Sequence, residues 1–161
     1  AACGVREPMQ QMPADAAVRT LLKRDESYAI HALVNIRENP GTNAALIAEH
    51  LQIPPAFLAK VLRKLVTAGF IRSRMGRNGG VELLVDLGTV SMLDVIEAVS
   101  GRVIADNCQL RELCATQQRK GRCGIKKAWF TATAAIRTAF GEIMLADLVD
   151  ETVVQPVTSA D

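Results

Sequence analysis

Three of the four cysteines in this chain lie close together, between Cys108 and Cys123, with Cys114 between them. Thiolates bind metal ions and iron–sulfur clusters, and they also react with oxidants and form disulfides. Basic residues surround the three thiols, and positive charge favours both a thiolate and an anionic cluster. These basic residues are Arg111, Arg119, Lys120, Arg122, Lys126 and Lys127. The segment therefore predicts metal or redox chemistry.

The rest of the sequence narrows the choice between these chemistries. The N-terminal region has no basic stretch followed by an apolar one, so we expect no secretory signal and a reducing, cytoplasmic location. A permanent disulfide is then disfavoured. Structural zinc sites usually contain closely spaced cysteine pairs, and the longer C-x5-C-x8-C spacing makes zinc a minor option. An iron–sulfur cluster and a reversible thiol switch both stay open.

The net charge of +2 is small, but the charges are unevenly distributed along the chain. Between Pro54 and Gly80 every charged side chain is basic, which creates a local field that attracts polyanions. The length of 161 residues and the apolar content of 49% suit one or two small domains with an aliphatic core. No apolar run approaches the roughly 20 residues that a membrane-spanning helix needs, so we expect no membrane contact.

The basic stretch falls on elements that suit DNA recognition. Apolar spacing predicts helices over about 18–37, 43–51 and 55–68, and a glycine-rich turn between the apolar segments 70–75 and 81–85 predicts a β-hairpin. A helix pair followed by a hairpin is a winged helix-turn-helix, whose second helix enters the major groove of DNA. That helix and the wing supply the predicted DNA contacts: Ala56, Phe57, Lys60, Arg63, Lys64, Arg72, Arg74 and Arg77.

Two further helices are predicted after the hairpin. The stretch SMLDVIEAVSG predicts a short helix that Ser91 and Asp94 cap, and a long helix follows the cysteines. Apolar residues of the long helix alternate at spacings of four and three, which is typical of a dimer seam. The predicted seam contains Ile125, Trp129, Ala132, Ile136, Ala139 and Ile143, with Trp129 as its large anchor. We therefore expect a homodimer, which suits the two-fold symmetry of many DNA sites.

The predicted fold is mainly α-helical with a small β-hairpin wing. We expect a flexible tail at 1–17, a winged helix-turn-helix domain at 18–88, and a connecting helix with the cysteine segment at 89–123. A dimerisation helix at 124–150 and a second tail at 151–161 complete the predicted organisation.

This order of parts resembles the Rrf-two family of bacterial transcription regulators, especially its iron–sulfur cluster-sensing members of the IscR and NsrR type. The similar stretches are YAIHALVNI, IAEHLQIPPAFLAKVLRKLVTAGFIRSRMGRNGGVEL, SMLDVIEAVSG and the three cysteines before Trp129. The resemblance spans about 21–149. It implies a winged helix-turn-helix repressor that binds double-stranded operator DNA as a homodimer.

The resemblance also implies an iron–sulfur cluster held by Cys108, Cys114 and Cys123. A 2Fe–2S cluster is favoured and a 4Fe–4S cluster is also compatible, because the second cysteine gap is longer than the family's usual one. The histidine that follows the third cysteine in IscR has no counterpart here. The fourth ligand would then come from the first helix of the partner subunit, with His31 as the first candidate and Glu26 or Asp25 as alternates.

Two classes of function follow from these features. The first is a transcription regulator whose operator affinity is controlled by the redox, nitric oxide or iron status of a cluster, with a cluster-free thiol-switch repressor as its alternative. The second is an iron–sulfur carrier or interaction module that uses the winged helix to bind protein. An enzyme is not predicted, because His31 and His50 stand without a nucleophile–base pair, and no small-molecule substrate is evident.

Overall fold

The computed structural model describes residues 19–74, 79–112 and 114–149. The tails predicted at 1–17 and 151–161 lie outside these ranges, and so does Arg77. The helices are α1 Arg24–Glu38, α2 Ala44–His50, α3 Pro55–Thr67, α4 Met92–Ser100, α5 Ala115–Lys120 and α6 Gly124–Glu142. The strands are β1 Ile71–Arg74 and β2 Gly80–Leu83, and three short 3₁₀ turns are η2 Leu87–Thr89, η3 Asn107–Leu110 and η4 Leu145–Leu148.

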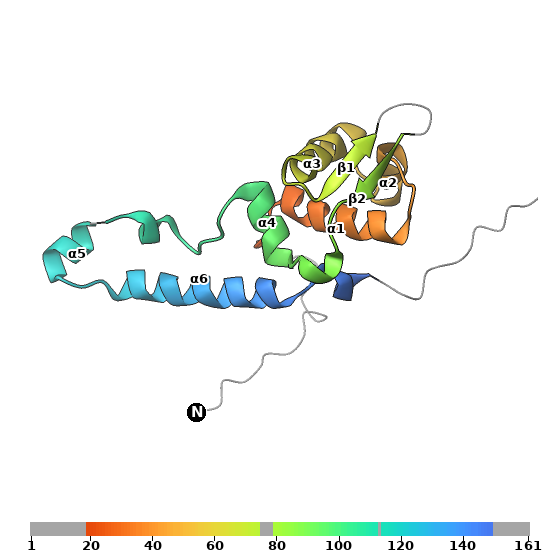
Figure 1. The fold of residues 1–161 in the computed structure, drawn as a ribbon. Helices are drawn as coiled ribbons and strands as arrows, with labels where there is room; N and C mark the ends of the chain where they lie inside the picture. The colour runs from red at the N-terminus through yellow and green to blue at the C-terminus, as the bar shows by residue number, and fades with distance from the viewer. Residues whose placement is uncertain (1–18, 75–78, 113, 150–161) are drawn as a thin grey trace, which may run out of the picture.

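Helices α1, α2 and α3 pack with the hairpin into one cluster, from which α6 and the cysteine segment extend (Figure 1). An apolar stripe of α1 is buried at Ala29, Ala32, Leu33 and Ile36. On α3 the buried residues are Leu58, Val61, Leu62 and Leu65, which share one helical face. Each such side chain contributes about 1.5–3 kcal/mol when it leaves water. The aliphatic core therefore holds the helix pair in place.

Local sequence signals set the ends of α2 and α3. Asn43 caps α2, because its side-chain oxygen accepts hydrogen bonds from the N–H groups of Ala45 and Leu46 at 3.0 and 3.1 Å. Pro55 opens α3 in the first turn, where its missing N–H costs nothing. Gly69 follows α3 with φ of +79°, which is the left-handed conformation predicted there.

The hairpin lies against the turn between α1 and α2. Ile71 pairs with Leu83 and Arg72 with Glu82, as in an ordinary antiparallel ladder. The N–H of Val81 donates to the carbonyl of Thr42 at 2.9 Å. A Cβ at Gly80 would lie 3.1 Å from that same carbonyl oxygen, so the close approach of the two backbones favours glycine. The wing is thus fixed at its base to the helical core.

Helix α4 is joined to the end of α6 by backbone hydrogen bonds. Ser91 and Asp94 form the predicted capping box at its start. The N–H of Met92 donates to the carbonyl of Ile143, and the N–H of Leu145 donates to that of Val90, both at 2.9 Å. Leu145 is completely buried in the core. The chain after α6 therefore turns back onto the winged helix.

This return corrects the predicted dimerisation helix at 124–150. Helix α6 ends at Glu142, and Ile143 has an extended backbone. The heptad spacing continues in the sequence beyond Glu142, but the hydrogen bonds to Val90 and Met92 replace those of another helical turn. None of the helices in the described ranges has both the length and the apolar character that spanning a bilayer requires.

Candidate DNA-reading face and cysteine segment

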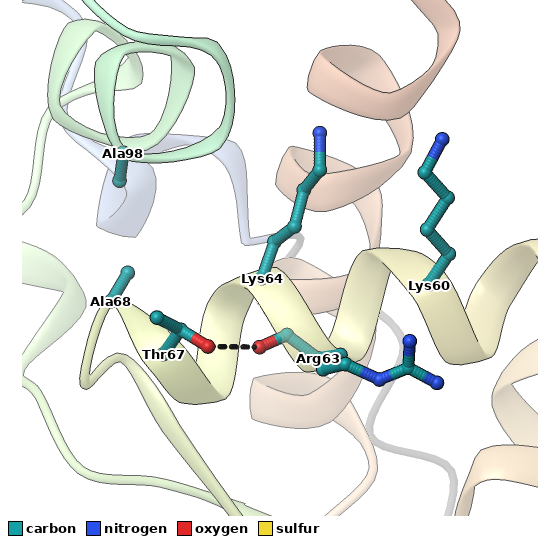
Figure 2. Close-up of a pocket in the computed structure, with 6 residues that line it drawn as sticks. All are labelled: Lys60, Arg63, Lys64, Thr67, Ala68 and Ala98. Atoms are coloured by element: carbon teal, nitrogen blue, oxygen red, sulfur yellow. Dashed lines mark hydrogen bonds between the residues drawn. The ribbon is translucent and has the colours of Figure 1, made fainter.

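The exposed face of α3 carries small and basic residues. Ala56, Lys60, Arg63 and Thr67 are exposed. A groove of about 580 Å³ lies between α3 and α4 and is lined by Lys60, Arg63, Lys64, Thr67 and Ala98. Figure 2 shows Lys60 and Lys64 extending in the same direction from successive turns of the helix. Small side chains near the start of α3 leave room for base edges, and the basic ones further along can reach phosphates.

Phe57 and Lys64 were both predicted to contact DNA, but the structure engages them inside the domain. The Phe57 ring stacks edge-to-face on Tyr28 with centroids 5.7 Å apart, and the Arg24 guanidinium lies 5.3 Å from the Phe57 centroid. Lys64 donates to Asp25 Oδ2 at 2.5 Å and to the Val99 carbonyl at 3.1 Å. Packing and ion pairing therefore occupy the two side chains.

The wing is less positive than its arginines suggest. Glu82 on β2 accepts a hydrogen bond from Arg72 Nε at 2.8 Å, and Arg74 Nε lies 3.1 Å from the same carboxylate oxygen. The hydrogen bond from Arg72 lowers the pKa of Glu82 below its usual value. Glu82 lies just beyond the acid-free stretch of the sequence and faces it across the hairpin. Sequence reasoning missed this partial neutralisation.

Each of the three cysteines lies within a helix or immediately before one. Cys108 lies in η3, Cys114 immediately precedes α5, and Cys123 immediately precedes α6. All three are half-buried and free of disulfides. Gly121 ends α5 with φ of +69°, which allows the sharp turn between the last two cysteines. The segment thus presents three thiols from three successive element ends.

The surroundings of Cys114 favour its thiolate. Its pKa is lowered first by the backbone N–H of Gln117, against a smaller effect of burial, and further by the N–H of Thr116, the Cys123 thiol and Lys126. Cys114 and Cys123 are therefore neighbours. Among the described residues, no three His, Cys, Asp or Glu side chains lie close enough to hold a metal together. Cys108 does not complete a three-ligand group with the other two.

The donor set fits an iron–sulfur cluster in chemistry but only in part in geometry. Half-buried free thiols beside Lys126 and a helix start are the ligands such a group takes. The Lys126 ammonium also donates to the carbonyl of Arg111 at 2.6 Å, which ties the segment to α6. One chain brings two thiols together, so a cluster would require Cys108 to move toward them.

The candidates for a fourth ligand lie on α1, away from the cysteine segment. His31 is exposed, with its ring centroid 6.1 Å from that of Tyr28. Glu26 is buried, and its carboxylate accepts a hydrogen bond from the N–H of Lys23 at 2.8 Å, which caps α1. Asp25 is paired with Lys64. Of the three, only His31 combines exposure with a side chain that lacks a polar partner in the described part of the chain.

The residues of the predicted seam on α6 lie in two different environments. Trp129, Ala132 and Ile136 line a cavity of about 350 Å³ together with residues of 19–26 and 103–105 of the same chain. Ile125 is 59% exposed, and Ala139 is exposed as well. Phe130, which the prediction left out, is 53% exposed. Only Thr133 is buried on α6, so the helix leaves much apolar surface in contact with water.

Comparison with known proteins decides the family. Residues 22–151 match the family model Rrf2, described as an iron-dependent transcriptional regulator. The chain belongs to the Rrf2 family. Its structure resembles that of CymR, the global cysteine regulator of B. subtilis, with a TM-score of 0.64 and 18% sequence identity over 81% of this chain and 96% of CymR. That likeness confirms the winged helix-turn-helix fold.

Two relatives are transcriptional regulators by name. Over 128 residues the chain is 29% identical to a protein of Lactococcus lactis subsp. lactis named putative HTH-type transcriptional regulator YffB; the match covers 78% of this chain and 82% of YffB. Over 126 residues it is 31% identical to the HTH-type transcriptional regulator IscR of Xenorhabdus nematophila, and this match covers 76% of this chain and 74% of IscR. This Rrf2 protein is therefore a DNA-binding transcriptional regulator and not an enzyme.

Proposed function

We propose that this Rrf2 protein is a homodimeric repressor whose affinity for operator DNA is controlled by an iron–sulfur cluster. The observation that carries the proposal is the placement of three free, half-buried thiols on one basic segment that is hydrogen-bonded to α6. The family description as an iron-dependent regulator supports the same conclusion. A 2Fe–2S cluster needs four ligands, and Cys108, Cys114 and Cys123 would supply three.

DNA binding in this proposal uses the exposed face of α3 and the wing. Ala56, Lys60 and Arg63 lie on that face, and Arg72 and Arg74 lie on β1. Arg77, outside the described residues, is proposed to reach the minor groove. Lys60 and Arg63 would contact phosphates or guanine edges, which makes affinity steeply dependent on salt. Phe57 and Lys64 are left out of the contacts, because the structure gives them partners within the domain.

Dimerisation in this proposal uses α6. Ile125, at the start of the predicted seam, is more than half exposed in the single chain, so this part of the seam is open to a second chain. A two-fold dimer would place a second α6 against this surface and bring the first helix of the partner toward the cysteines. His31 of the partner subunit is then the proposed fourth ligand, with Glu26 or Asp25 as alternates.

When bound, the cluster supplies an oxidation- and nitric oxide-sensitive link between the cysteine segment and the partner subunit. The chain's own residues do the rest. Lys126 holds the segment to α6 through the Arg111 carbonyl, and Thr133 on α6 accepts hydrogen bonds from Ala105 N–H and Gln109 Nε2, both at 2.8 Å. A change at the thiols is therefore passed to α6, on which the spacing of the two DNA-reading helices would depend.

Anaerobic purification tests the cofactor. We expect iron and acid-labile sulfide in the protein and a visible absorption spectrum. Cys108→Ala, Cys114→Ala and Cys123→Ala should each abolish the spectrum or make it labile, while Cys3→Ala should leave it unchanged. His31→Ala should keep a bound cluster with a shifted spectrum, because water or thiol can fill one position. Protein that holds no iron and cannot be reconstituted would contradict the proposal.

Operator binding tests the DNA-reading face. Lys60→Ala and Arg77→Ala should each weaken binding to operator duplex and leave the dimer intact, because both side chains are proposed to contact DNA and neither lies on α6. The measurement is an electrophoretic or anisotropy titration over a range of salt concentrations. Unchanged affinity in both variants would remove these residues from the interface.

One observation favours a second function, a cluster-free thiol switch of the same fold. Cys114 lies beside Cys123 and has a lowered pKa, which is the arrangement of a reactive thiol with a resolving partner. Hydrogen peroxide would oxidise the Cys114 thiolate to a sulfenic acid and release hydroxide, which takes up a proton from solvent. The Cys123 thiol would then attack the sulfenic sulfur, form the disulfide and release water. Mass spectrometry of iron-free protein after peroxide treatment distinguishes the two functions.

A further inference from the structure

One ion pair joins the recognition helix to two other helices. Lys64 lies on α3 with its side chain 31% exposed, and its ammonium contacts Asp25 on α1 and the Val99 carbonyl on α4. Asp25 Oδ2 lies 2.5 Å from the ammonium nitrogen, and the Val99 oxygen lies 3.1 Å from it. Helices α1, α3 and α4 therefore meet at a single charged group.

The same end of α4 is also attached to α6. Glu97 stands two residues before Val99, and its carboxylate is paired with Arg137 of α6. It also accepts a hydrogen bond from the N–H of Val103 at 2.8 Å, where the chain leaves α4 toward the cysteine segment. One short stretch of α4 thus contacts the recognition helix through Lys64 and α6 through Arg137.

We propose that Lys64 is a positioning residue for DNA recognition, which fixes α3 to α1 and to the end of α4, so that α4 transmits the placement of α6 to the DNA-reading face. The inference rests on the proposed use of α3 as the recognition helix. It assigns to Lys64 no contact with DNA, and it names the stretch from Glu97 to Val99 as the connection between the two halves of the molecule.

Electrostatics and exposure support this role over a phosphate contact. The Lys64 side chain is about two-thirds shielded, and its ammonium, already bonded to a carboxylate and a carbonyl, would lose both partners on turning to DNA. Lys60, one turn earlier on α3, is exposed and lines the same groove (Figure 2). It forms no hydrogen bond or ion pair with the described residues. Lys60 is therefore the matched control on the same helix.

The test compares Lys64→Met with Lys60→Met in the full-length protein. Affinity for operator and for unrelated duplex is measured against salt concentration, and thermal unfolding is followed in parallel. Lys64→Met should weaken operator binding about tenfold, a size typical of perturbed coupling networks, and leave both the salt slope and the affinity for unrelated duplex unchanged. Lys60→Met should reduce the salt slope by about one on both duplexes, because one phosphate contact is lost.

A second variant separates positioning from competition. Asp25→Asn removes the ionic partner of Lys64 but leaves the positive charge of Lys64 in place. If Lys64 positions α3, Asp25→Asn weakens operator binding as Lys64→Met does. If Asp25 instead withholds Lys64 from DNA, Asp25→Asn strengthens binding and steepens the salt slope, which would overturn the proposal. Lys64→Arg should restore part of the operator affinity, since it keeps a charged donor.

Arg137→Met tests the contact between α4 and α6, because it removes the ionic partner of Glu97. It should weaken operator binding without a change in salt slope, and the double variant with Lys64→Met should lose less than the sum of the two single losses. Additive losses, a reduced salt slope in Lys64→Met, or unchanged operator affinity in that variant would each overturn the proposal. Wild-type protein that binds no duplex would instead overturn the assignment of α3 as the recognition helix, on which this inference rests.

Discussion

The two ends of this molecule differ in how far they complete their own structure. The winged-helix end, from α1 to α4, buries a continuous aliphatic core, and Leu33, Ile47, Leu58 and Leu65 are completely inaccessible to water. The other end, which we term the arm, comprises η3, α5 and the first half of α6, residues 106–130. Neither η3 nor α5 has a buried residue among those described. Leu110 and Ile125 are 70% and 59% exposed there.

This difference separates a part with its own buried core from a part whose described short helices bury no residue. The winged helix gains its stability from burial within one chain. The arm is held by a few polar contacts, such as Lys126 with Arg111 and Thr133 with Gln109. Its apolar side chains Leu110, Ile125 and Phe130 face water. Small changes in the arm can therefore alter its placement without unfolding the winged helix, as a sensing segment requires. A second chain and a cluster are what we propose to complete it.

The largest expected effect contrasts one apolar truncation at each end. Leu58→Ala should lower the free energy of unfolding by about 3–4 kcal/mol, because it leaves a cavity in a closed core. Ile125→Ala should change it by less than about 0.5 kcal/mol in the monomer, because its side chain is 59% exposed. Urea denaturation at low protein concentration measures both. Equal losses would mean that the arm is as self-sufficient as the winged helix.

Trp129→Ala should reveal the partner that the arm lacks. Trp129 is half-buried and lines a cavity within its own chain, so only part of the ring is left for a second copy. We expect the dimer to be weakened by about 2–3 kcal/mol, as for an aromatic interface anchor. Sedimentation equilibrium should show a shift toward monomer with retained helical content. Ala139→Ser, on the same helix, serves as the mild control, and an undiminished Trp129→Ala dimer would place the interface elsewhere.

The winged-helix end was also the more predictable one from sequence. Its elements are defined by local signals, such as the apolar spacing that buries Leu58, Val61, Leu62 and Leu65 and the capping box of Ser91 with Asp94. These signals act over a few residues, so a single sequence shows them. The predicted order of helix pair, wing, short helix and long helix is confirmed.

Contacts between distant residues were beyond such signals. The end of α6 at Glu142 depends on backbone hydrogen bonds to Val90 and Met92, while the heptad spacing alone predicted more helix. The ion pair of Lys64 with Asp25 was not predicted, because Asp25 lies on another helix. The convergence of three thiols on one cluster also remains a prediction, because it depends on groups that a single chain does not bring together.

The ion pair between Glu97 of α4 and Arg137 of α6 should make stability depend on pH. Burial raises the pKa of Glu97, but the bonds from Arg137 and from the Val103 N–H outweigh it, so the pKa lies below its usual value. A carboxyl with a lowered folded-state pKa stabilises the fold above its unfolded pKa of about 4.3 and loses that contribution as pH falls through the folded pKa. Glu97→Gln should therefore cost about 1–2 kcal/mol near pH 7 and little at acidic pH.

Thermal unfolding from pH 7 down to pH 3 checks this prediction. The difference in stability between wild type and Glu97→Gln should shrink steadily as the pH falls below about 4.5, where the wild-type carboxyl takes up its proton. Glu142→Gln, at the exposed end of α6, is the control and should follow the wild-type curve. A constant difference at all pH values would show that packing, and not the charge of Glu97, joins α4 to α6.

The smallest expected effect concerns the wing, where an acidic side chain pairs with the arginines that are proposed to contact DNA. Glu82 neutralises part of the charge on Arg72 and Arg74. Its side chain is 44% exposed, so removing its charge should leave thermal stability unchanged, because exposed pairs contribute little. Glu82→Gln should raise the affinity for duplex DNA about two- to threefold at low salt and steepen the salt dependence, because both arginines become free for phosphates.

Glu142→Gln again serves as the control, since it changes the net charge equally but lies at the end of α6. Weaker binding in Glu82→Gln would instead mean that the carboxylate orients the two arginines for their DNA contacts.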